Sequence, residues 1–116
     1  MITILSPPQL SNAAFPKNTV HVENYHLDGL VVGCGREHEQ PDFRSINNGE
    51  EYLLEFNDTG TRLCTFNWNA KHTTFPVFNH ALSDRCSGGS MPECWWRAME
   101  KEFQFLEEDW VTMHYW

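Results

Sequence analysis

Residues 61–68 read TRLCTFNW, and this stretch decides the expected fold. Read with a period of two, it places Cys64, Phe66 and Trp68 on one face and the intervening residues on the other. That alternation is typical of a half-buried β-strand. A cysteine beside two large aromatic side chains indicates a strand whose inner face is both packed and cross-linked. The alternative is an ordinary core strand with a free thiol.

Size and composition limit the classes of protein to consider. A chain of 116 residues is long enough for one domain with a single core. Aromatic residues make up 14% and include five tryptophans, so bulky side chains should fill that core. The formal net charge of −8 argues against nucleic acid and against an anionic membrane surface as partners. No apolar run approaches the roughly 18 residues of a membrane span, so we expect no membrane insertion.

The number of cysteines and the first residues of the chain indicate whether the protein is secreted. Four cysteines in a small, loop-rich chain favour a disulfide framework and a secreted, extracellular protein. Residues 1–6, MITILS, are too short and lack the basic start of a complete signal peptide. We expect that a signal has been removed; the alternative is a chain that is not secreted by the usual route. Residues 1–19 contain three prolines and predict an irregular arm before a domain of residues 20–116.

Short alternating segments recur along the domain, separated by turn signals and polar loops. Besides residues 61–68, strands are expected at 20–24, 30–34, 52–56, 74–78, 94–99 and 110–116. Pro76 cannot donate to a sheet ladder, so its strand should lie at an edge or place the proline at a bulge. Polar segments at 35–44, 69–73 and 81–93 predict loops or connections. Seven or eight short, mostly antiparallel strands predict an all-β fold, a small disulfide-bonded β-sandwich.

Residues 97–109, RAMEKEFQFLEED, are ambiguous. Their composition suits a helix, but Phe103 and Phe105 alternate and strands flank the segment. We predict a hairpin with its turn near residues 100–101 or 107–109. On the same alternation, eight side chains should be largely buried: Val22, Val32, Leu54, Phe56, Phe66, Trp68, Val77 and Trp96.

Cysteines and aromatic residues follow one another in a recognisable order. The series runs Cys34, Gly49-x-x-Tyr52-x-x-x-Phe56, Cys64-x-Phe66-x-Trp68, Phe75-x-Val77, Arg85-Cys86, Cys94-x-Trp96, and Trp110 through Trp116. No single motif in it is specific, but the ordered series with its spacing resembles the plant self-incompatibility S1 family, the S-protein homologues, over about residues 20–116. The resemblance implies a small secreted β-sandwich that acts as an extracellular signal, and it carries no catalytic residues over to this chain.

The chain departs from the family's pattern at three places. Glu100-Lys101-Glu102 follows the C-x-W motif where members usually have a glycine. Pro41 lies in a region where members often have an Asp-rich loop, and the arm has no obvious counterpart.

Four cysteines allow three pairings, and sequence alone does not choose among them. Cys34 and Cys64 both lie at core-facing positions of expected central strands. Cys86 and Cys94 flank a flexible Gly-Gly-Ser-Met-Pro segment that can bring them together. We therefore predict the bridges Cys34–Cys64 and Cys86–Cys94.

The sequence gives little support for a metal site or a catalytic site. Six histidines are scattered along the chain without the close Cys/His spacing of zinc sites, so no metal or cofactor is predicted. The acidic pairs and runs at 50–51, 100–102 and 107–109 are expected to be solvated, since glycosidases need two carboxylates converging across a cleft. No serine sits in a nucleophile elbow, so no catalytic residue is assigned. Asn57-Asp58-Thr59 is an N-glycosylation sequon in an expected turn; the alternative is that it is unused.

The predicted function is that of a non-enzymatic signalling ligand, expected to be a monomer, which binds a cell-surface receptor or other extracellular protein through its loops. Residues 35–48 and 79–93 form the longest expected loops, where recognition can vary without disturbing the packing. Within them the candidate contact residues are Arg36, Glu37, His38, Asp42, Arg44, Asn79, His80, Asp84 and Arg85. One alternative is a secreted effector of the same fold that mimics a host signal or inhibits an extracellular host protein. Another is a small hydrolase.

Overall fold

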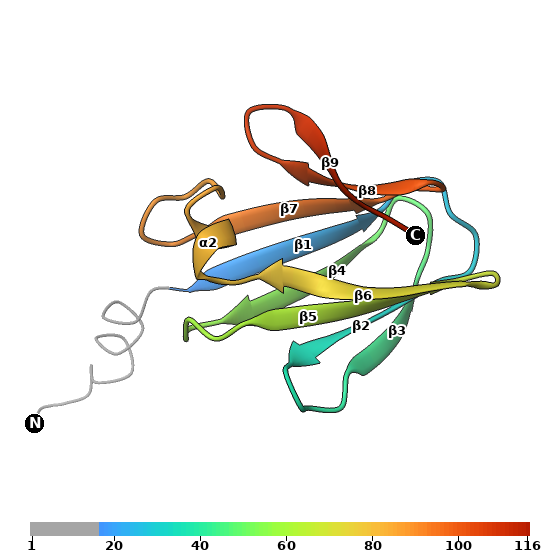
Figure 1. The fold of residues 1–116 in the computed structure, drawn as a ribbon, viewed down its shortest axis with the longest axis horizontal. Coiled ribbons are helices and arrows are strands. Elements are labelled where there is room, and N and C mark those ends of the chain that lie inside the picture. The colour runs from blue at the N-terminus through green and yellow to red at the C-terminus, as the bar shows by residue number, and fades with distance from the viewer. Residues whose placement is uncertain (1–16) are drawn as a thin grey trace, which may run out of the picture.

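A computed structural model describes residues 17–116, and these residues form a β-sandwich with one short helix at one end (Figure 1). The predicted arm lies outside the described residues as far as residue 16. In chain order the elements are β1 (Asn18–Asn24), β2 (Leu30–Arg36), β3 (Asp42–Ile46), β4 (Glu51–Phe56), β5 (Arg62–Trp68), β6 (Lys71–Phe78), α2 (His80–Ser83), β7 (Glu93–Ala98), β8 (Glu102–Leu106) and β9 (Trp110–Tyr115).

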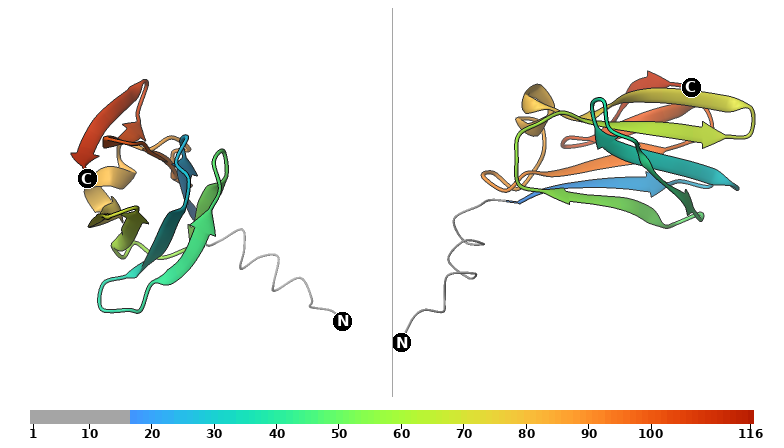
Figure 2. Two further views of the ribbon diagram at one scale, coloured as in Figure 1. Left: turned by 90° about the vertical axis from the view of Figure 1, so that its right-hand side faces the viewer. Right: turned by 90° about the horizontal axis from the view of Figure 1, so that it is seen from below.

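The strands form two sheets that face each other across the core, as the views in Figure 2 show. One sheet has five strands in the order β4-β1-β7-β8-β9, and the other has four in the order β3-β2-β5-β6. β1 and β7 run parallel, whereas the other paired strands run antiparallel. The all-β sandwich predicted from the sequence is confirmed. Residues 17–116 hold nine strands rather than seven or eight.

The core lies between the sheets and follows the predicted alternation. In β5, Cys64 and Phe66 are fully buried, but Trp68 is only partly buried. Trp68 ends its strand beside the turn to β6, where its Nε1 donates to the Asp28 carbonyl at 2.8 Å. Of the other side chains predicted to be buried, Val22, Val32, Val77 and Trp96 are buried, while Leu54 and Phe56 pack on the core only partly buried.

Two disulfides hold this core. Cys34 on β2 lies directly opposite Cys64 on β5, with their Cα atoms 4.1 Å apart, so the first bridge cross-links two neighbouring strands of one sheet. The second bridge joins Cys86, beyond α2, to Cys94 near the start of β7. Both pairings match those predicted from the sequence.

Pro76 lies on β6, an edge strand of the four-stranded sheet. It pairs with Leu63 where the register shifts between Arg62 and Leu63. Both positions predicted for this proline, an edge strand and a bulge, therefore apply. On the outer side of an edge strand no other strand pairs, so a missing N–H there costs nothing.

The ambiguous segment near the C-terminus forms strands. β8 begins after a turn at residues 99–101 and ends before a second turn at 107–109, so both predicted turn positions are used. Phe103 and Phe105 are buried, in agreement with the alternation that favoured a hairpin over a helix.

Three predicted loops are wrong in part. Residues 35–44 are not one exposed loop, because β2 continues to Arg36 and residues 42–46 form the edge strand β3. Most residues of β3 are polar, so the sequence does not predict this strand. An edge strand open to solvent shows little alternation of apolar and polar residues. The connection at residues 69–73 is shorter than predicted, as β6 already begins at Lys71. Within residues 81–93 the first three belong to α2.

Candidate functional site

The turn between β4 and β5 lies at the end of the sandwich that carries α2 (Figure 1), and its Asp58 also contacts Arg36 at the end of β2. Asp58 lies in that turn and accepts hydrogen bonds from both Nη atoms of Arg62, at 3.0 and 2.9 Å. Arg36, at the end of β2, donates to the same carboxylate at 3.0 Å, and the Gly60 amide donates at 2.8 Å. One carboxylate thus fastens the end of β2 to the β4–β5 turn.

The electrostatics of this turn follow from burial of the arginine rather than of the acid. The Arg62 side chain is only 8% exposed, and its guanidinium lies 4.1 Å from the centre of the Phe56 ring. A buried guanidinium needs a counter-charge, because an unpaired charge away from water is costly. Hydrogen bonds from Arg62 and from the Gly60 amide hold the pKa of Asp58 far below its ordinary value, so the carboxylate stays ionised.

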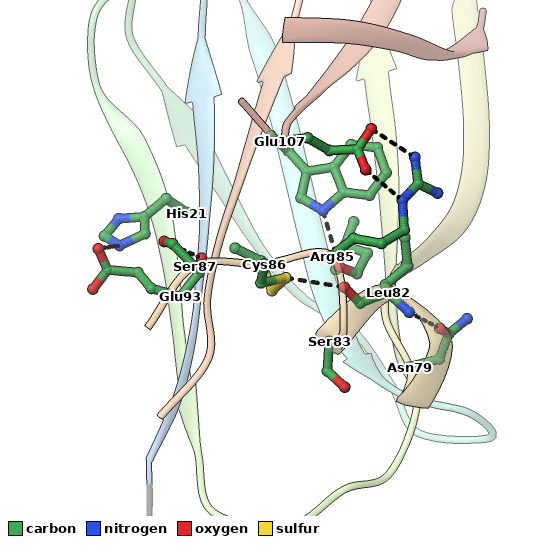
Figure 3. Close-up of a disulfide and its surroundings, with 12 residues drawn as sticks. His21, Asn79, Leu82, Ser83, Arg85, Cys86, Ser87, Glu93 and Glu107 are labelled. Carbon is green, nitrogen blue, oxygen red and sulfur yellow. Dashed lines mark hydrogen bonds and ion pairs between the residues drawn. A yellow bond between two sulfur atoms is a disulfide. The ribbon is translucent and has the colours of Figure 1, made fainter. Parts of the chain in front are cut away.

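A second ion pair positions the segment after α2. Arg85 donates from Nε and Nη2 to the two carboxylate oxygens of Glu107, at 2.9 and 3.0 Å (Figure 3). These hydrogen bonds lower the pKa of Glu107 and raise that of Arg85. The pair joins this segment to the β8–β9 turn, and the neighbouring Cys86–Cys94 bridge joins it to β7. Its shape is therefore held at two points.

α2 itself is a single turn fixed by its first residues. Asn79 is the N-cap, and its Oδ1 accepts from the Leu82 amide at 2.8 Å. Asparagine is among the preferred N-cap residues because its side chain satisfies an otherwise unpaired amide. Leu82 is buried and holds the turn to the core, which leaves His80 and Asp84 exposed.

A cavity of about 300 Å³ opens between α2 and the β4–β5 turn. It connects the second contact segment, residues 79–93, with the β4–β5 turn, because its wall comes from the start of β1, the β4–β5 turn, the end of β6, α2 and the segment before β7. The lining residues are Asn18, Asn57, Thr59, Phe78, His80, Ser83, Ser90 and Pro92.

The predicted contact residues of the first segment have different surroundings. Asp42 and Arg44 lie on β3 rather than in a loop, and they pair with each other at 2.7 Å. The guanidinium of Arg44 also lies 4.9 Å from the centre of the Tyr52 ring on β4, so this pair covers the side of the sandwich between β3 and β4. Glu37 and His38 lie in the exposed β2–β3 turn, where His38 has a positive φ of 65°.

The predicted residues thus divide by what they already contact. Arg36, Asn79 and Arg85 serve the fold as a salt-bridge donor, an N-cap and a second salt-bridge donor. Four side chains are exposed and make no hydrogen bond or ion pair with residues 17–116: Glu37, His38, His80 and Asp84. These four are the groups at this end whose polar atoms remain open to a partner.

Two residues that organise this end were missed by the sequence analysis. The sequence assigns Asp58 only to a sequon, and Arg62 is contained in the expected strand 61–68 without a role of its own. The available signal was an arginine on the inner face of a strand, in phase with Cys64 and Phe66, four residues after an aspartate. A charge in phase with core residues needs a partner, and Asp58 is the nearest acid in the sequence.

Serine hydroxyls and possible metal ligands at this end can be checked one by one. Serine hydroxyls there donate to backbone carbonyls, as Ser83 does to His80 and Ser87 to Glu93, and not to a side-chain base. Within residues 17–116 no group of three or more His, Cys, Asp or Glu side chains is placed to hold a metal ion. In the same part of the chain no helix has the length and apolar character needed to cross a membrane.

Comparison with known proteins adds one finding. Neither the curated proteins nor the solved structures contain a significant match to this chain. A family model, described as plant self-incompatibility protein S1, matches residues 19–116, which is nearly the whole described domain. The paired cysteines, the aromatic core and the nine-stranded sandwich all lie within that match. The chain therefore belongs to the plant self-incompatibility protein S1 family.

Proposed function

We propose that this protein is a secreted, non-enzymatic signalling ligand that binds a cell-surface partner through the end of the sandwich formed by α2, the β2–β3 turn and the β4–β5 turn. Membership of a family of secreted signalling proteins supports the class of function. The observation that carries the proposed surface is the position of the β4–β5 turn. This turn binds Arg36 of the first contact segment through Asp58 and shares a cavity with the second, while Glu37, His38, His80 and Asp84 stay exposed.

A rigid surface of this kind suits recognition. Arg36, Arg62 and the Cys86–Cys94 bridge fix the backbone under the exposed side chains, so little conformational entropy is lost when a partner binds. The mixture of two acids and two imidazoles favours a polar partner that offers both donors and acceptors. Such a surface fits a ligand that works as a monomer.

The test measures binding of the labelled protein to intact cells that bear the partner. Because β3 lies inside residues 35–48, exchanging that whole segment would remove a strand, and point variants are the sharper tool. We expect Glu37→Ala with His38→Ala, and separately His80→Ala with Asp84→Ala, to weaken binding by about tenfold.

The matched control places two changes at the opposite end, Asp28→Ala and Lys101→Ala, where binding should change by less than about twofold. Unaltered circular dichroism would show that every variant is folded. If both pairs at the α2 end leave binding at the wild-type level, the proposed surface is wrong. A turnover detected with ester or glycoside substrates would overturn the non-enzymatic part of the proposal.

We also propose that Asn57 carries an N-linked glycan. Its side chain is exposed in the β4–β5 turn, and both Asn57 and Thr59 line the cavity at this end. A glycan there would border the proposed surface. A mass decrease on enzymatic deglycosylation of the secreted protein, absent in Thr59→Ala, is the expected result; equal masses before and after would contradict it.

A further inference from the structure

The outer face of the five-stranded sheet carries a row of apolar and aromatic side chains that runs across the strands. His21 on β1 lies between Leu53 on β4 and Trp95 on β7 in the registers of those pairs. Continuing the antiparallel register of β7 and β8 by one residue places Leu106 beside Trp95, and Leu106 pairs with Trp110 on β9. We call this row the transverse stripe.

The transverse stripe crosses the whole sheet on its outer face. Leu53 is 42% exposed, the other four side chains are partly buried, and that of His21 is only 12% exposed. The rings of His21 and Trp95 pack face to face in the middle of the stripe, with their centroids 3.6 Å apart and an angle of 3° between their planes. Five strands about 4.8 Å apart give it a length of about 19 Å.

Carboxylates border the stripe on both sides. The next row on one side begins with Glu51 on β4 and Glu23 on β1, which pair with each other. On the other side, Glu55 on β4 and Glu93 on β7 both lie beside Thr19 on β1. Over β4, β1 and β7 the stripe therefore runs between acidic side chains on both sides, which we call the acidic rims.

Two of these acids are held only by ion-pair contacts that are longer than a hydrogen bond. Glu93 Oε1 lies 3.8 Å from Nε2 of His21 (Figure 3), and Glu23 Oε1 lies 3.6 Å from Nε of Arg97. Both distances exceed a hydrogen bond, and those two nitrogens are buried polar atoms without a partner among the described residues. Neither carboxylate makes a side-chain hydrogen bond within residues 17–116, so both can accept one from another molecule.

The cations on this face do not neutralise the rims. Arg97 lies over the rings of Tyr25 and Trp110, at 4.4 and 3.9 Å from their centres, and is half-buried there. Lys17 pairs with Glu55 at 3.4 Å at the end of β1. Glu23, Glu51, Glu55 and Glu93 outnumber these two cations by two, before the His21 imidazole, which lies 2.7 Å from Glu51 Oε1, is counted.

We propose that this face binds a basic amphipathic helix of a partner protein, with the helix axis along the transverse stripe. A helix rises about 1.5 Å per residue, so about 13 residues span the stripe and present one apolar row to it. Lys and Arg side chains on either side of that row would meet Glu23 and Glu51 on one rim and Glu55 and Glu93 on the other. A strand is a poorer fit, because strands join a sheet at its edge through the backbone.

Charge favours a basic helix on this face over two other candidates, a second copy of the chain and the chain's own N-terminal segment. A second copy of this chain would bring an equally acidic face, and two such faces repel each other. Residues 1–16 contain no Lys or Arg, so the chain's own N-terminal segment offers nothing to the acidic rims. The proposal concerns a surface separate from the α2 end and does not depend on the function proposed for that end.

The experiment uses a synthetic helical peptide of about 14 residues with leucines along one face and lysines on both flanks. The control peptide keeps the leucines and replaces the lysines by glutamate. We expect the lysine peptide to bind the full chain at least about tenfold more tightly than the glutamate peptide, and to lose affinity as salt rises from about 0.05 to about 0.3 M. Amide shift changes in the NMR spectrum should centre on His21, Trp95 and Leu53.

Variants locate the site. Leu53→Asp and Glu93→Lys should each lower the affinity for the lysine peptide by about tenfold. Glu37→Lys, which makes the same charge change as Glu93→Lys but at the α2 end, should alter that affinity by less than about twofold. Leu53 and Glu93 are exposed, so folding should survive both changes, and circular dichroism checks this. The proposal is overturned if neither peptide binds, if both bind equally, if the two face variants bind like wild type, or if the shift changes centre on the α2 end. The α2-end variants should leave peptide binding unchanged, so this test and that of the proposed function can fail separately.

Discussion

Replacing Asp58 by asparagine should destabilise the domain by about 2 kcal/mol, and the size of the effect follows from the contacts of each oxygen. Asparagine keeps Oδ1, which can still accept from Nη1 of Arg62 and from the Gly60 amide. It turns the second oxygen into an NH₂ group that faces donors on Arg62 and Arg36. Losing a hydrogen bond to a charged group costs about 1.5–3 kcal/mol, and the exposed Arg36 pair adds at most about 1. Because the carboxylate is 38% exposed, solvent reduces the total, and we take about 2 kcal/mol.

The measurement is equilibrium unfolding in urea with both disulfides intact. A loss of about 2 kcal/mol should lower the midpoint by roughly 1 M. The change leaves the sequon at Asn57 in place, so an unglycosylated protein from a bacterial host gives a like-for-like comparison. The matched control is Asp84→Asn, which alters an exposed aspartate at the same end and should leave the midpoint within about 0.3 M.

At low pH the difference in the free energy of unfolding between wild type and Asp58→Asn should disappear. The folded-state pKa of Asp58 lies below its ordinary value of 3.8, so the unfolded chain takes up a proton at this site before the folded one does. The stabilisation by Asp58 is therefore complete above about pH 5 and declines as the pH falls below about 4 towards the folded-state pKa. The asparagine variant lacks this titration, so the two stability curves should converge in acid.

A double-mutant cycle shows whether the effect runs through Arg62. Combining Asp58→Asn with Arg62→Gln should give a coupling energy of about 1–2 kcal/mol. Equal midpoints for wild type and Asp58→Asn, or a coupling energy near zero, would refute the reasoning, because a buried arginine cannot lose its counter-charge without cost.

Two further predictions concern the core. Trp96 is fully buried and its Nε1 donates to the Val77 carbonyl, whereas Trp68 is partly open, so Trp96→Ala should cost about 4 kcal/mol and Trp68→Ala about 2 in the same assay; equal costs would contradict the difference in burial. Replacing both cysteines of the Cys34–Cys64 bridge by alanine should cost about 3.5 kcal/mol, roughly 1 more than the same change in the second bridge, because the first closes a loop of 30 residues and the second a loop of 8. Peptide mapping under non-reducing conditions should find these two links, and a fragment joining the two bridges in another pairing would contradict them.

Alternation predicted the parts of the fold where one strand face is buried and the other is not. β5 and β2 show it clearly, and their inward cysteines meet across the sheet as expected. β3 escaped prediction because four of its five residues are exposed and its two apolar residues, Phe43 and Ile46, lie three positions apart, so they do not alternate with period two. Phe43 pairs with Gly33 and its ring covers the glycine, a contact visible only once the strands are aligned.

The arrangement of the α2 end could be predicted only in part. Loop positions follow from turn residues, so the exposure of Glu37 and His80 was within reach. The contacts that fix the loops could not be predicted, because Arg36 and Asp58 are 22 residues apart and meet only when the β4–β5 turn crosses from one sheet to the other. A sequence shows that an inward arginine needs an acid, but several acids are available and the topology decides among them.

The transverse stripe lies furthest from what a single sequence reveals. Its five side chains come from five strands, and in each strand the residue reads as an ordinary outward position. Period two assigns each side chain to the outer face, but only the register places them in one row, and a shift of one strand by two residues would scatter them while leaving every strand equally amphipathic. The parallel pairing of β1 with β7 is decisive here, because it puts Trp95 beside His21 although the two lie more than seventy residues apart in the sequence. A surface built across strands is thus a property of sheet register, and its partner has to be sought from the assembled face rather than from any motif.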